Sequence, residues 1–207
     1  MRTDLVADWE IPPTPPGATG RLERFMGPGK TRAESAVELG GGVLCAALLA
    51  AGLWSPAASE PRENWSVLEL VIIALAGLDL IGGVLTNATN AAKRWYHRPE
   101  PGVRRSRMIF VAAHLGHLAV VGLVVLDGDL LWALGNAGLL LAGACAVETA
   151  PVHLKRPVAV AVWMAAVLTN LFWLTVPEAL LWFAPLFFLK LLVCHLVPEA
   201  PLRRRDG

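Results

Sequence analysis

The stretch Ser66–Thr89, SVLELVIIALAGLDLIGGVLTNAT, decides the fold because it is apolar over almost its whole length. A helix needs about 20 such residues to cross a hydrocarbon core roughly 30 Å thick. Its charged residues are Glu69, near the start, and Asp79, near the middle. Because backbone polar groups inside a bilayer must be satisfied within their own segment, we predict a transmembrane helix here.

Five further stretches have the same character, and the whole chain is 55% hydrophobic and 17% charged. A soluble domain usually carries about 25% charged residues. We therefore predict an all-α, polytopic membrane protein in which six transmembrane helices form an antiparallel bundle. The remaining predicted spans are Ala36–Trp54, Met108–Leu126, Leu130–Val147, Val158–Val176 and Ala179–Val197.

The distribution of lysine and arginine predicts the orientation. Most of the 18 basic residues fall in the N-terminal arm, in the loops that follow the second and fourth spans, and at the chain end. All of these segments lie on one side of the predicted membrane, whereas Arg62 falls on the opposite side. Short loops rich in lysine and arginine stay in the cytoplasm. We predict a multi-pass protein of the plasma (inner) membrane with both termini cytoplasmic. Its predicted parts are a proline-rich cytoplasmic arm (1–31), a transmembrane domain (32–198) and a basic cytoplasmic tail (199–207).

Several predicted helices begin with recognisable capping chemistry. In a capping box, a hydroxyl and a carboxylate three residues apart satisfy the first free backbone N–H groups of a helix. The sequence offers three such pairs, Thr31 with Glu34, Ser66 with Glu69 and Thr175 with Glu178. Asp127 and Asp129 are available to cap the fourth span, and Pro157 suits the first turn of the fifth. The proline-rich segment Ile11–Gly17 is expected to be extended.

Four ionisable residues lie well inside the predicted spans: Asp79, His114, His117 and Lys190. Such side chains are costly in a bilayer and usually face the interior of the bundle. At 1.5 Å per residue, Asp79, His117 and Lys190 reach nearly the same depth, and His114 shares a helix face with His117. We predict that they form one ionisable centre. Glu148, by contrast, is placed at a helix end, where interfacial water is expected to solvate it.

A polar stripe extends from Asp79 toward the basic loop that follows the second span. With 100° per residue, polar side chains recur on nearly the same helix face from mid-membrane to the cytoplasmic side. A stripe of this length is expected to face protein or water, and it supplies the predicted substrate-binding residues. These are Thr86, Asn87, Asn90, Lys93, Arg94 and His97.

The charge balance bears on partners. The net charge of +1 implies no nucleic-acid partner. The basic stretch Lys93–Arg107 lies beside the membrane surface, where it is expected to contact anionic lipid head groups. The sequence names no cofactor and leaves the oligomeric state open, a homo-oligomer included.

Three classes of function fit these observations. The first is transport or conduction of protons or a small solute, with Asp79 as the titrating carboxylate and His114 and His117 as a relay or gate. The second is an intramembrane enzyme acting on a lipid, in which Asp79, His114 and His117 act as metal ligands or acid–base groups, although HxxH alone is a weak metal signal. The third is a structural or partner-binding membrane subunit, in which Asp79 and Lys190 form no more than a buried ion pair. Transport is placed first because the sequence shows neither a nucleophile nor a strong metal motif.

Overall fold

The computed structural model describes residues 5–56 and 63–204. The fold is mostly helical, and six helices are long and apolar enough to cross a membrane. They are Arg32–Leu53, Val67–Ala88, Val103–Val125, Leu130–Thr149, Val152–Phe172 and Glu178–His195. These helices confirm the six predicted apolar segments and suggest a multi-pass membrane protein. Glu60 and Arg62, on which part of the orientation depends, lie outside the described residues.

Some of these spans consist of several shorter elements, so the structure has more helices than spans. In chain order the elements are β1 (Leu5–Ala7), α1 (Gly17–Met26), α2 (Arg32–Leu53), α4 (Val67–Ala88), α5 (Asn90–Tyr96), α6 (Val103–Ala113), α7 (Leu115–Val120), the π-helix η2 (Val121–Val125), α8 (Leu130–Thr149), η3 (Val152–Leu154), α9 (Lys155–Phe172), η4 (Glu178–Leu180), α10 (Phe183–Phe188), the π-helix η5 (Leu189–His195) and β2 (Leu202–Arg204). The third and sixth spans both end in π-helical turns, which are frequent at functional sites.

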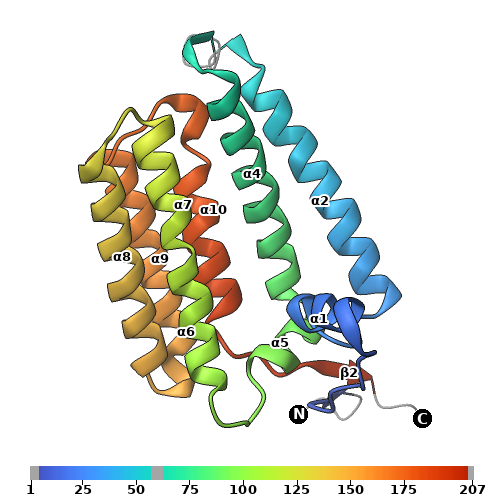
Figure 1. The fold of residues 1–207 in the computed structure, drawn as a ribbon. Helices are drawn as coiled ribbons and strands as arrows, with labels where there is room; N and C mark the ends of the chain where they lie inside the picture. Colours follow the sequence, from blue (N-terminus) through green and yellow to red (C-terminus); the bar gives the residue numbers. More distant parts are fainter. Residues whose placement is uncertain (1–4, 57–62, 205–207) are drawn as a thin grey trace.

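The spans form a bundle with α4 between two unequal neighbours (Figure 1). On one side α4 packs against α10 and η5, and the core there includes Leu80, Phe187 and Leu191. On its other side α4 packs against α2, which is described in full and has no buried residue. The core of the molecule therefore lies among the last four spans and α4, and α2 is peripheral.

The predicted capping chemistry is present at most helix starts. Both halves of the capping box form at Thr31 and at Ser66, and the Asp129 carboxylate accepts the Trp132 N–H at 2.8 Å. The box predicted at Thr175 is wrong. Pro177 has extended backbone (ψ 146) where the helix would need its second residue, so the sixth span begins with a short 3-10 turn.

Both ends of the described chain lie at the same end of the bundle, which we call the terminal end (Figure 1). The N-terminal arm folds across it. Residues 11–15 form no helix or strand, as expected, but α1 follows them and was not predicted. β1 pairs with β2 in antiparallel register, with Leu5 opposite Arg204 and Ala7 opposite Leu202. The all-α prediction therefore needs one addition, a two-stranded sheet that joins the two ends of the chain.

The second span ends at Ala88, one residue earlier than predicted. Thr89 has extended backbone, and its side-chain oxygen accepts the Ala92 N–H at 3.2 Å, so it caps a new helix, α5. This break means that the polar stripe does not continue along a single helix. The residues beyond Thr89 leave the face that carries Asp79.

Candidate functional site

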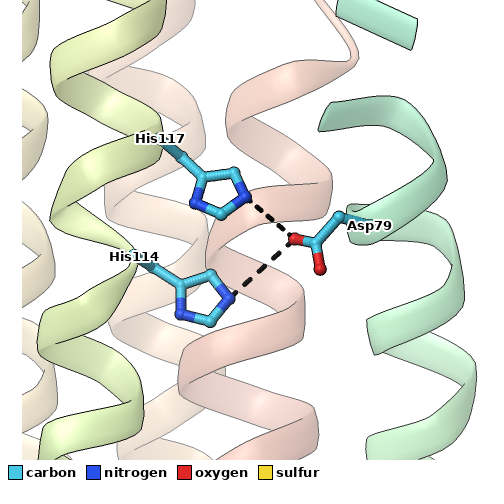
Figure 2. A group of neighbouring side chains, drawn as sticks. All are labelled: Asp79, His114 and His117. Atoms are coloured by element: carbon cyan, nitrogen blue, oxygen red, sulfur yellow. Dashed lines mark ion pairs between the residues drawn. The ribbon is translucent and has the colours of Figure 1, made fainter. Parts of the chain in front are cut away.

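Asp79 of α4 receives basic side chains from two other spans. Its Oδ2 atom lies 2.6 Å from Lys190 Nζ, 3.0 Å from His117 Nε2 and 3.9 Å from His114 Nε2. Figure 2 shows both histidines reaching from the third span toward the carboxylate. The structure thus brings together all four residues of the ionisable centre expected from the sequence.

The two histidines are held by their own span. The Nδ1 atom of His114 lies 2.7 Å from the Phe110 carbonyl, which can only accept, so Nδ1 carries the proton and Nε2 faces Asp79. The His114 and His117 rings stack at 4.9 Å with an interplanar angle of 12°. The span is interrupted at His114, between α6 and α7, which turns both rings toward α4.

Lys190 reaches Asp79 because Gly83 has no side chain. A Cβ atom at Gly83 would lie 2.2 Å from Lys190 Cε and 2.8 Å from Lys190 Nζ. Lys190 belongs to the π-helix η5, and its side chain is 2% exposed, whereas the Asp79 side chain is 42% exposed. The ammonium group is therefore buried against α4, and the carboxylate borders open space.

We expect Gly83→Ala to destabilise the protein by about 1–3 kcal/mol, because the new methyl group pushes the end of the Lys190 side chain away from Asp79 and weakens a charge-assisted hydrogen bond. Gly82→Ala is the matched control, since no described atom lies within 4 Å of a Cβ at that position. In the control, the higher helix propensity of alanine should leave stability unchanged or slightly raised. Thermal unfolding in detergent compares the two variants, and equal behaviour would show that Gly83 has no such packing role.

Two cavities meet at Asp79. The smaller, of about 270 Å³, extends along α4 toward the terminal end and includes Thr86, Asn87 and Lys190 in its wall. The larger, of about 630 Å³, extends between α4 and the third span toward the opposite end and includes His117. Asp79 lines both. A carboxylate in this position borders space that leads toward each end of the bundle.

Glu38 of α2 also lines the smaller cavity and was overlooked in the sequence. Its two oxygens pair with the Thr86 hydroxyl and the Lys30 ammonium. The signal was available, because Glu38 lies in an apolar span beyond the positions that cap a helix. The site therefore contains a second carboxylate, 17% exposed, on the peripheral helix.

The six predicted substrate-binding residues divide into two groups. Thr86 and Asn87 line the smaller cavity. The other four make contacts at the terminal end: Asn90 donates to the Leu202 carbonyl, Lys93 to the Cys194 and Val197 carbonyls and Arg94 to the Gly29 carbonyl, and the His97 ring bonds the His195 carbonyl. They join the sixth span, the N-terminal arm and β2 to α5.

His97 lies outside the spans, and its burial, reinforced by the charges of Arg107 and Lys93, lowers its pKa to about 3. A histidine in an unfolded chain has a pKa of about 6.5. Between these values the unfolded state binds a proton that the folded state does not. Stability is therefore full above about pH 6.5 and falls as the pH drops toward about 3, by at most about 1.4 kcal/mol per pH unit.

We expect His97→Gln to remove this part of the acid sensitivity. The measurement is thermal unfolding in detergent at about pH 7.5 and about pH 5, with the exposed His153→Gln as control. The loss of stability between the two pH values should shrink in the His97 variant and stay unchanged in the control. An unchanged loss in both would show that other groups cause the acid sensitivity.

Glu148 differs most from the expectation. Its side chain is 4% exposed rather than solvated, and its Oε1 atom lies 2.7 Å from Arg107 and 3.4 Å from Arg104. Lys155 lies 3.7 Å from the other carboxylate oxygen and donates to the Glu148 carbonyl at 2.9 Å. One carboxylate thus joins the third, fourth and fifth spans at the terminal end, and we call these four residues the Glu148 cluster.

The centre also has a donor set suited to a metal ion. One ligand atom from each of Asp79, His114 and His117 lies within 4.8 Å of the others. Nitrogen and carboxylate donors of this kind suit zinc or iron. The Lys190 ammonium, however, contacts the same Asp79 oxygen that would bind the ion. Metal binding would require Lys190 to move or to lose its proton.

No family model, curated protein or solved structure matches this chain.

Proposed function

We propose that this chain is a transport protein that moves protons through its membrane domain, with Asp79 as the carrier. The observation that supports this most directly is the place of Asp79 between two cavities that extend toward opposite ends of the bundle. Ionisable residues in such positions commonly form proton relays in membrane proteins. The Asp–Lys–His arrangement supplies groups that accept, hold and release a proton.

The contacts of Asp79 indicate how the proton moves. In its ionised form Asp79 accepts hydrogen bonds from Lys190 at 2.6 Å and His117 at 3.0 Å. A proton that arrives on Asp79 cancels the charge that holds both partners. His117 is 31% exposed and lines the larger cavity, so in this proposal it passes the proton between Asp79 and that space. The smaller cavity reaches Asp79 from the other side.

The orientation is part of the proposal. The basic connections support a cytoplasmic terminal end. Arg104 and Arg105 are exposed at that end, where they can contact anionic head groups. Reporter fusions test this orientation. A fusion after residue 100 and another after residue 207 should both report a cytoplasmic position. A signal from the other side of the membrane at either point contradicts it.

The proton flux is measured on the purified chain in liposomes that hold a pH-sensitive dye. A pH gradient should collapse faster than in protein-free liposomes. The double variant Asp79→Asn, Lys190→Met should abolish the difference, because it removes the carrier without leaving an unpaired charge. Asp127→Asn is the matched control, since Asp127 is an exposed loop carboxylate whose positive φ of 50° asparagine tolerates. Equal flux through the double variant and the wild type would refute the proposal.

A second candidate is an intramembrane enzyme that uses a metal ion to act on a lipid, and the three clustered donor atoms favour it. Elemental analysis of the purified chain tests it. About one zinc or iron per chain, lost in His117→Ala and retained in His153→Ala, would favour the enzyme over the proton carrier. If the wild type contains no more metal than His117→Ala, the result argues against the enzyme.

A further inference from the structure

The smaller cavity has an aromatic side. Phe25 of α1, Tyr96 of α5 and Phe110 of α6 all line it. The Phe110 ring lies 6.4 Å from Phe25 and 6.0 Å from Tyr96, measured between centroids, so three rings adjoin one space. Lys190 Nζ is 5.9 Å from the Phe110 centroid. A positive charge thus already lies beside one of these faces, where the ring quadrupole attracts it.

The rest of the cavity wall is polar. Glu38 and Asp79 provide two carboxylates from α2 and α4. Asn87, which is 5% exposed, also lines the cavity, and its side-chain nitrogen is buried with no hydrogen-bond partner among the described residues. A buried donor without a partner is costly unless a ligand or water accepts its hydrogen bond. The wall therefore combines cation-binding groups with one free donor.

Building on the proposed transport function, we propose that this cavity binds a small organic cation, an alkylammonium group that carries an oxygen a few bonds away. Aromatic rings beside carboxylates recognise quaternary ammonium groups. The Asn87 nitrogen would donate to the oxygen. The volume of about 270 Å³ corresponds to about nine water molecules at roughly 30 Å³ each, which accommodates a group the size of choline.

The bound cation would compete with Lys190. Glu38 is already paired with Lys30, so Asp79 is the carboxylate that the cation would approach, and Lys190 is its present partner. The cation would therefore bind Asp79 in place of the Lys190 ammonium.

The proposal is tested on the purified full chain in a maltoside detergent, with equilibrium binding of choline measured near pH 8. Two analogues separate the interactions. The uncharged isostere 3,3-dimethylbutanol should bind at least tenfold more weakly than choline. Tetramethylammonium has no oxygen to accept a hydrogen bond from Asn87, so its affinity should not change when Asn87 is substituted. Phe110→Leu keeps the apolar bulk but removes the ring, and it should weaken choline binding about tenfold. Phe172→Leu is the control, because Phe172 is exposed and lies at the end of α9 far from the cavity; this variant should leave choline binding unchanged.

The competition for Asp79 is tested with Lys190→Met. This variant removes the ammonium that contacts Asp79 and should strengthen choline binding. Binding no stronger than in the wild type would overturn the competition.

Free and lipid-borne forms of the cation are compared directly. Short-chain phosphatidylcholine that displaces choline shows that a lipid head group enters the cavity, and failure to displace it shows that the free cation is the ligand. Both outcomes support the alkylammonium site. Equal binding of choline and the uncharged isostere, or an unaffected Phe110→Leu, overturns it. Proton flux in liposomes without any organic cation would persist in that case, so failure of this inference is distinguishable from failure of the proposed transport.

Discussion

Asp79→Asn alone is expected to reduce the free energy of unfolding by about 3–5 kcal/mol. The substitution removes the carboxylate but leaves the Lys190 ammonium, which is 2% exposed, without its partner. The Asp79 side chain is itself 42% exposed, but the ammonium that it leaves behind is buried, and a buried charge without its partner is costly. Thermal unfolding in detergent should show a fall of roughly 10 °C in the midpoint.

The double variant Asp79→Asn, Lys190→Met should recover most of that loss. Methionine has a similar length and no charge, and an apolar replacement of a buried ion pair is often neutral or stabilising. A double-mutant cycle measures the coupling between the two positions directly. If the double variant is less stable than the single Asp79 variant, the two side chains do not form an energetically coupled pair. Asp127→Asn, in an exposed loop, should have no measurable effect.

Glu148→Gln is expected to have the second-largest effect, again about 3 kcal/mol or more. The variant leaves the positive charges of Arg104, Arg107 and Lys155 around a side chain that is only 4% exposed. Since the three cations come from the third and fifth spans, their repulsion acts on the packing of those spans against the fourth.

Thermal unfolding at low and high salt separates the repulsion between exposed charges from the cost of buried ones. Part of the stability lost in Glu148→Gln should return in about 1 M salt, because ions screen the partly exposed Arg104 charge. Glu178→Gln at the opposite end, where the carboxylate is exposed, should change stability by less than about 0.5 kcal/mol. An equally small effect of Glu148→Gln would show that water, rather than protein, balances the three cations.

The spans and the centre could be predicted from the sequence because both depend on local quantities. The length of an apolar run decides whether a segment can cross a bilayer, and the rise per residue places Asp79, His117 and Lys190 at one depth. Their common depth was enough to predict that they meet, since ionisable side chains at one level of a bundle turn away from lipid and toward one another. The capping boxes at Thr31 and Ser66 are local in the same way.

The remainder depends on contacts between distant parts of the chain. A constant helical angle predicts that the stripe continues beyond Asp79 on one helix face. Thr89 begins a new helix, however, so Lys93 and His97 contact the sixth span instead. Glu148 was assigned to interfacial water because its arginine partners lie in another span. Such long-range pairings have no periodicity in the sequence, and the same holds for the pairing of β1 with β2.

The strand pair at the terminal end also orders the assembly of the molecule in time. β1 precedes every span and β2 follows all of them, so their hydrogen bonds can form only after the sixth span has been synthesised. The Tyr96 hydroxyl of α5 already donates to the Phe25 carbonyl at 2.7 Å, so α1 can dock as soon as α5 exists. During biogenesis the pairing of β1 with β2 is therefore a late step, which joins the two ends of the chain after all six spans have been made.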